Sequence, residues 1–89
     1  MNVLPLLAEF LGTFLLVMSI LASGNALVIG ATLGLLVLLL GGVSGAHVNP
    51  AVSIAMLLKG AIGTMEFVTY SAAQMAGGAA ALYAYKVLA

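Results

Sequence analysis

One short stretch of a largely apolar chain, Gly41 to Ser53 (GGVSGAHVNPAVS), combines hydrogen-bonding side chains with helix-breaking glycine and proline. Asn49 is a favoured helix N-cap, and Pro50 after it suits the first helical position, so a short helix is expected to begin there. The cap uses the Asn49 side-chain oxygen and leaves the amide NH2 free to donate. The positive end of the helix dipole lies at the same point. The stretch therefore predicts a site that favours neutral acceptor molecules and repels cations.

The composition of the whole chain indicates a membrane protein. Its 89 residues are 65% apolar and 4% charged, with a mean hydropathy of +1.36 and no cysteine. This balance is far outside the range of soluble globular proteins. One histidine and two lysines give no nucleic-acid surface, and the lack of cysteine excludes disulfides and thiolate metal sites. We therefore expect an all-α integral membrane protein, in a membrane that the sequence does not specify.

Apolar runs separated by turn residues predict the helices. Helices are expected over about 4–23, 26–42 and 64–88, each long enough to cross a hydrocarbon core of roughly 30 Å. The turn residues Ser23-Gly24-Asn25 separate the first two helices, and Gly41-Gly42 is expected to end the second. The apolar run 50–58 is too short to span, because about nine helical residues cover only some 13 Å. We expect one domain, residues 1–89, with three transmembrane helices and one half-helix.

The segment that leads into the half-helix, residues 43–49, is rich in glycine and polar residues. Irregular backbone cannot face lipid, because each unpaired N–H or C=O group costs several kcal/mol there. This segment must be buried in protein or line water. It is therefore expected to be a re-entrant loop.

Three segments taken together resemble the aquaporin, or major intrinsic protein, family. They are Ala8 to Phe14 (AEFLGTF), Ser44 to Val52 (SGAHVNPAV), and Ala73-Gln74 followed by Gly77. Their order and spacing match the amino-terminal repeat of that family across the whole chain. The Asn-Pro-Ala box alone is a weak signal, and the flanking residues make it specific. The resemblance implies half of an aquaporin-like fold and a passive channel for water, with small neutral solutes such as glycerol, urea or ammonia as further substrates.

Family members carry two such repeats, inverted in the membrane, whose half-helices meet at the centre of one pore. Since this sequence contains one repeat, we expect a second copy, inserted the other way up, to complete the pore as an antiparallel homodimer. Four such dimers would correspond to the tetramer of the family. Positive charge is nearly balanced, with the amine of Met1 and Lys59 on one side and Lys86 on the other, which permits both orientations. A separate second-half partner and a non-conducting structural or regulatory subunit are the alternatives.

The resemblance also implies pore-lining positions around the box formed by Asn49, Pro50 and Ala51. The constriction positions fall at Ile29, Val37, Ala46 and Val52, all of them apolar. Val52 stands where an arginine commonly follows the box of the second repeat. A valine there implies a wider and less polar constriction than a guanidinium would leave.

Three polar residues are expected to support or line the loop. The resemblance implies that Glu9 accepts hydrogen bonds from the loop, although a position at the membrane interface is the alternative. His47 is either a buried histidine that holds the loop or a partly pore-facing side chain that narrows one mouth and makes flux pH-dependent. Gln74 is expected to bind loop backbone rather than solute.

Small residues predict close contacts between helices: Gly12, Gly30, Gly77 and Gly78. No catalytic or metal site is expected. One histidine and two glutamates supply neither a nucleophile–base pair nor a ligand cluster, so we expect neither an enzyme nor a cofactor.

Overall fold

Four α-helices make up the computed structural model, which describes residues 2–89. They are α1 (Leu4–Ser23), α2 (Ala26–Ser44), α3 (Pro50–Lys59) and α4 (Thr64–Leu88). The amine of Met1, which enters the expected charge balance, lies outside the described residues. The irregular segment before α3 is confined to residues 45–49, because α2 continues to Ser44 instead of ending at residue 42.

The end of α2 depends on one particular glycine. Gly45 has a φ of +88°, in the left-handed region, and its N–H bonds to the carbonyl of Gly41. This is the usual way in which a glycine terminates a helix. Gly41 and Gly42 lie within the last turns of α2 and do not interrupt it. The Gly41-Gly42 pair was therefore expected wrongly to end the helix.

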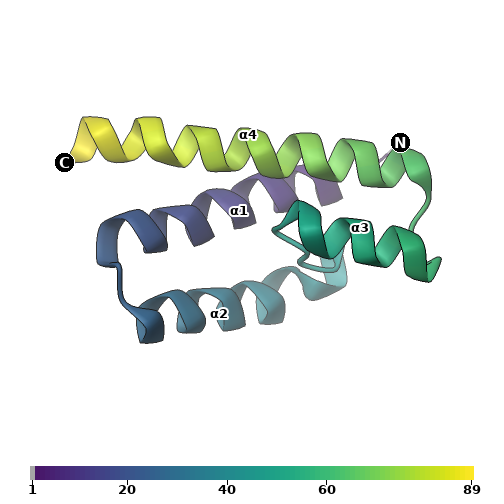
Figure 1. Ribbon diagram of the computed structural model, residues 1–89, viewed down its shortest axis with the longest axis horizontal. Coiled ribbons are helices and arrows are strands. Elements are labelled where there is room, and N and C mark those ends of the chain that lie inside the picture. Colours follow the sequence, from purple (N-terminus) through teal and green to yellow (C-terminus); the bar gives the residue numbers. More distant parts are fainter. Residues whose placement is uncertain (1) are drawn as a thin grey trace.

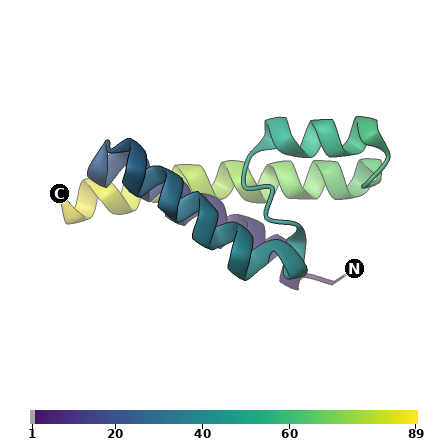
Figure 2. The same cartoon turned by 90° about the horizontal axis from the view of Figure 1, so that it is seen from below.

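The helices form a bundle around α1 and α4, which run in the same direction (Figure 1). α2 runs antiparallel to α1 and packs against it, while α3 packs against α4. Seen from a second direction, α3 lies alongside the first half of α4 (Figure 2). The end of α2, the end of α3 and the start of α4 share one end of the molecule, and the short α1–α2 connection lies at the other (Figure 1).

Close contact between α1 and α4 requires the glycine at position 77. A Cβ atom there would lie 2.4 Å from the carbonyl oxygen of Phe10 and 3.2 Å from the backbone nitrogen of Phe14. Backbone atoms cannot move aside as a flexible side chain does. Gly77 therefore sets the distance between the two helices that carry most of the buried polar groups.

By length and composition, α1 and α2 could each cross a membrane. α4 has 25 residues and about the necessary length, but it is less apolar than α1 and α2 and is not a clear spanning helix by composition. It carries Glu66 and Lys86 near its two ends and buries Gln74 at its centre. Buried polar side chains lower the average hydropathy of a helix without facing lipid. The described residues thus form an all-helical fold in which two helices have the length and composition to span a membrane.

Candidate functional site

The carboxylate of Glu9 is the centre of a buried polar cluster. Its side chain is 0% exposed. Oε2 accepts hydrogen bonds from Ser44 Oγ (2.7 Å) and from the His47 N–H (3.0 Å). Oε1 accepts from the Val48 N–H (2.8 Å) and from Gln74 Nε2 (2.8 Å). These donors supply the partners that a buried carboxylate needs. Glu9 therefore lies stably in the interior of the helix bundle and not at its surface.

The loop that Glu9 holds has an unusual backbone. Ala46 and Val48 have φ values of +50° and +47°, a region that costs side chains with a Cβ of order 1–3 kcal/mol each. Both residues are buried, and the Ala46 N–H bonds to Ser44 Oγ. A loop of this kind persists only where its surroundings hold it. Here the consecutive N–H groups of His47 and Val48 converge on one carboxylate.

Gln74 links the loop support to α3. Its Nε2 donates to Glu9 Oε1 and to Ser53 Oγ, the latter at 2.9 Å. The expectation that Gln74 binds loop backbone was therefore wrong. Glu9 already occupies the N–H groups of His47 and Val48, which leaves Gln74 to bridge two side chains. The amide orientation follows from the carboxylate, because the reverse orientation would place two oxygens against each other.

His47 is buried in this single chain, with 8% of its surface exposed. Its Nδ1 lies 2.9 Å from Ser53 Oγ, and its ring packs at a tilt against the ring of Tyr70, with centroids 5.0 Å apart. Since Ser53 Oγ already accepts from Gln74, its own hydrogen is available to His47 Nδ1. This network favours the tautomer of His47 that is protonated on Nε2.

Tyr70 and Ser53 belong to the cluster and were missed from the sequence. The hydroxyl of Tyr70 donates to the carbonyl oxygen of Ser44 at 2.7 Å, and Ser53 is 0% exposed. Helical spacing offers a signal for both residues. Tyr70 precedes Gln74 by one turn of α4, and Ser53 follows Asn49 by one turn of α3, so each shares a face with a residue already singled out.

Asn49 lies at the start of α3, partway along α4 rather than at an end of the molecule (Figure 1). Its Oδ1 accepts from the Ala51 N–H at 2.8 Å, and Pro50 occupies the first turn of the helix. The side chain is exposed, and its amide nitrogen makes no hydrogen bond within residues 2–89. A free donor therefore stands at the positive end of a helix dipole.

The expected constriction residues fall into two groups. Ala46 is buried in the loop and Val52 is half-buried on α3, each three residues from Asn49 in the chain. Ile29 lies near the start of α2, at the end of the molecule that carries the α1–α2 connection and away from the loop, and Val37 is 50% exposed farther along α2 (Figure 1). One copy of the chain therefore does not bring Ile29 to the loop.

The glycines expected at helix contacts differ in their surroundings. A Cβ on Gly12 would lie 2.7 Å from Val48 Cγ1, so Gly12 makes room for the loop as well as for α2. A Cβ on Gly78 would lie 3.7 Å from Val17 Cγ2, an ordinary contact. Gly30 has nothing within 4 Å of that position in the described chain.

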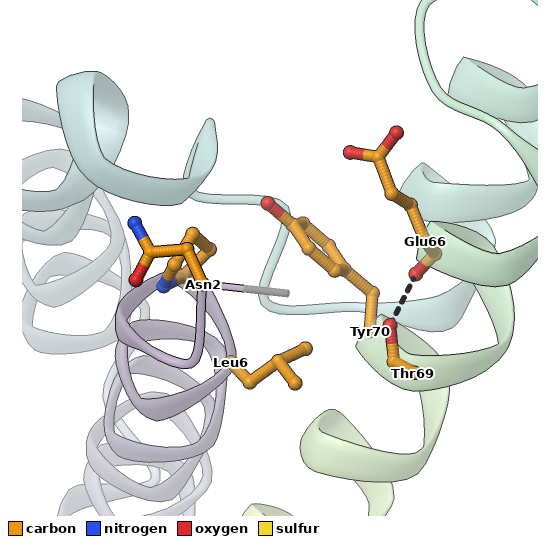
Figure 3. A pocket seen from close by; sticks show the side chains of 6 residues that line it. Asn2, Leu6, Glu66, Thr69 and Tyr70 are labelled. Carbon is orange, nitrogen blue, oxygen red and sulfur yellow. Dashed lines mark hydrogen bonds between the residues drawn. The ribbon is translucent and has the colours of Figure 1, made fainter.

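A separate cavity of about 250 Å³ opens between the first turns of α1 and α4 (Figure 3). It is lined by Asn2, Pro5, Leu6, Glu66, Thr69 and Tyr70. In Figure 3 the hydroxyl of Tyr70 points toward the segment that follows α2, away from Glu66. Tyr70 thus lines the cavity with its ring and also contacts the loop region through Ser44 and His47.

Comparison with known proteins assigns the chain to a family. The family described as major intrinsic protein matches residues 2–88. The chain is 42% identical to a glycerol uptake facilitator protein-like 6 from Lactiplantibacillus plantarum, over 90% of the chain and 41% of that protein. It is 39% identical to the aquaglyceroporin AqpS of Rhizobium meliloti, over 82% of the chain and 38% of that protein. No solved structure matches significantly.

Mammalian relatives show the same pattern, with 41% identity to aquaporin-2 of Bos taurus over 83% of the chain and 32% of that protein. The chain therefore spans about two fifths or less of the length of these curated relatives. The family match nevertheless covers nearly the whole chain, and the identities exceed what a shared fold alone requires. The chain belongs to the major intrinsic protein family.

Proposed function

We propose that this chain forms a passive membrane channel for water and small neutral solutes such as glycerol, urea or ammonia. In this arrangement α1, α2 and α4 cross the membrane, and residues 45–59 enter and leave on the same side. The length of α3 supports the re-entrant path, because its 10 residues cover about half of a hydrocarbon core. The burial of the loop polar groups against Glu9 also supports it, since unpaired backbone is not tolerated in lipid.

The observation that carries the proposal is the free amide of Asn49 at the start of α3. A water molecule or a hydroxyl of a solute can accept from this donor, and the helix dipole orients such acceptors. The same dipole opposes cations at that point. The site therefore suits uncharged hydrogen-bonding molecules.

We propose that a second copy in the opposite orientation supplies the other half of the pore. The relatives are more than twice as long as this chain, so a complete pore of their kind requires further protein. Asn49 is exposed, Val37 is half exposed and Gly30 has no packing contact in the described chain, which leaves these residues available to a partner. In an inverted copy, Ile29 of one chain would join Val37, Ala46 and Val52 of the other at each mouth of the pore. Four such dimers would then form the higher assembly.

The solute range follows from the apolar constriction and from the names of the relatives. A half-buried Val52 next to the box leaves more space and less positive charge than an arginine would. Two of the relatives above are a glycerol uptake facilitator-like protein and an aquaglyceroporin. We therefore extend the substrate range beyond water to glycerol-sized neutral molecules.

The test is osmotic volume change of proteoliposomes that contain the purified chain. Stopped-flow light scattering should show faster shrinkage in sucrose than for empty liposomes, followed in glycerol by faster reswelling. Rates equal to those of empty liposomes in both osmolytes would contradict the channel and favour a non-conducting subunit. Conduction that appears only after a separate second half is added would contradict the homodimer alone.

A further inference from the structure

Tyr70 is a buried side chain that the proposed pore does not use directly. It lies on α4 with 7% of its surface exposed, and its ring forms one wall of the cavity between α1 and α4 (Figure 3). Its hydroxyl leaves that cavity and donates to the carbonyl oxygen of Ser44. A tyrosine hydroxyl buried in this way has a specific partner rather than water.

The partner of Tyr70 is the residue from which the loop departs. Ser44 is the last residue of α2, and its carbonyl is one of the terminal groups that a helix leaves without an internal partner. Its Oγ donates to Glu9 on α1, while its carbonyl accepts from Tyr70 on α4. Ser44 is therefore hydrogen-bonded to α1 through its side chain and to α4 through its backbone carbonyl.

This bond joins elements that do not otherwise pack together. α2 packs against α1, and across the described residues it makes no backbone contact with α4 or α3. The Tyr70 hydroxyl therefore fixes the end of α2 relative to α4, the helix on which α3 also packs. This hydrogen bond joins α2 and α4 directly, beside the indirect route from Ser44 Oγ through Glu9 to Gln74.

Tyr70 contacts the loop at a second point. Its ring packs against the ring of His47 at a centroid distance of 5.0 Å and an angle of 56°. The two contacts fall on either side of Ala46, which has the strained φ of +50°. Holding the residues that flank a strained position is an effective way to maintain it.

We propose that Tyr70 is a positioning residue that holds residues 45–49 in their strained conformation and so sets the backbone that lines the proposed pore. The effect on permeation rests on the proposed function, whereas the effect on the loop does not. Tyr70 contacts no solute in this account and acts through Ser44 and His47.

The test compares Tyr70→Phe with Tyr83→Phe in the full chain. Tyr70→Phe keeps the ring against His47 and removes only the hydroxyl. Tyr83 is on the same helix and is 66% exposed, so its substitution controls for the loss of a tyrosine from α4. Hydrogen–deuterium exchange reports on the N–H groups of Ala46, His47 and Val48 without any need for conduction. The same proteoliposomes give the ratio of glycerol to water permeability.

We expect Tyr70→Phe to speed exchange of the loop amides about tenfold, as the loss of one buried hydrogen bond predicts. Exchange of the α1 amides around Gly12 should stay unchanged. The glycerol-to-water permeability ratio should shift as well, because the loop backbone lines the proposed pore. A smaller folded fraction would instead lower both fluxes equally and leave that ratio constant. Tyr83→Phe should change neither quantity.

Loop exchange equal to that of the unmodified chain would overturn the proposal, whether or not the protein conducts. Faster loop exchange with an unchanged permeability ratio, in a chain that conducts, would overturn the link to the pore. If the unmodified chain does not conduct, the proposed function fails and the exchange result alone decides whether Tyr70 positions the loop.

Discussion

Asn25 and Asn49 perform the same local task in two different regions of the molecule. Each caps a helix through Oδ1, with Asn25 accepting from the N–H groups of Leu27 and Val28, and Asn49 from that of Ala51. Asn25 lies in the short turn between α1 and α2 at one end of the molecule, whereas Asn49 follows a buried loop partway along α4 (Figure 1). Capping chemistry is therefore not what distinguishes the candidate pore residue. Its placement is.

The same contrast holds for other pairs of identical residues. Glu9 is completely buried beneath the loop, whereas Glu66 is exposed in the first turn of α4. A Cβ on Gly77 would meet the backbone of α1, whereas a Cβ on Gly30 would meet no other part of the described chain within 4 Å. We therefore expect substitutions in the buried region around the loop and the α1–α4 contact to destabilise the fold. Substitutions at exposed positions such as Glu66 and Gly30 should have little effect on stability. Substituting both members of each pair tests this division.

The largest effect is expected for Glu9→Gln. The amide would place a donor against the N–H groups that now converge on the carboxylate, and the loss of charged hydrogen bonds should cost about 3 kcal/mol or more. Unfolding in detergent, followed by circular dichroism, measures this cost. Glu66→Gln keeps an acceptor for the Gly63 N–H and removes only the negative charge in the first turn of α4, so it should cost about 0.5 kcal/mol. Equal costs for the two substitutions would contradict the buried role of Glu9.

An intermediate effect is expected for Gly77→Ala. The added Cβ meets backbone of α1 and should destabilise the fold by about 1–3 kcal/mol, since neither helix can yield locally. Gly30→Ala on the open side of α2 should be neutral or stabilising by up to about 1 kcal/mol, because alanine favours a helix more than glycine does. The same unfolding assay applies to both. A larger loss at Gly30 would show that the open face of α2 is already covered by a partner.

The smallest effect on stability, and a specific effect on transport, is expected for Val52→Arg. A guanidinium beside the box should narrow the constriction, and a barrier of about 1.4 kcal/mol would slow glycerol roughly tenfold. Water flux should survive. Stopped-flow measurements on proteoliposomes distinguish the two fluxes, since shrinkage in sucrose reports water flux and reswelling in glycerol reports glycerol flux. Parallel loss of both fluxes would indicate that Val52 supports the fold instead of the constriction.

Much of the helical pattern could be predicted from local signals, and the errors have local causes too. The turn at Ser23-Gly24-Asn25 and the Asn49-Pro50 pair mark helix boundaries that the backbone also shows. Gly41-Gly42 was misleading because glycine weakens a helix without ending it, and the left-handed conformation that ends α2 belongs to Gly45.

The cluster around the loop was only partly predictable. Glu9, His47 and Gln74 stand out because polar residues are rare in this sequence. The bonds of Tyr70 to Ser44 and of Gln74 to Ser53 join residues 26 and 21 positions apart, and no local pattern encodes them. Residue type alone does not distinguish Tyr70 from a tyrosine at the membrane interface. Its role emerges only from the packing of α4 near the end of α2.

Water permeability of Asn49→Asp beside Asn25→Asp tests the central claim most directly. Aspartate caps a helix as well as asparagine does, so both variants should fold. It lacks the amide donor and adds a negative charge, so Asn49→Asp should lower the osmotic water permeability about tenfold or more, a barrier increase of about 1.4 kcal/mol. Asn25→Asp should leave it unchanged. Equal permeability of the two variants would contradict the account that the free amide at the start of α3 lines the pore.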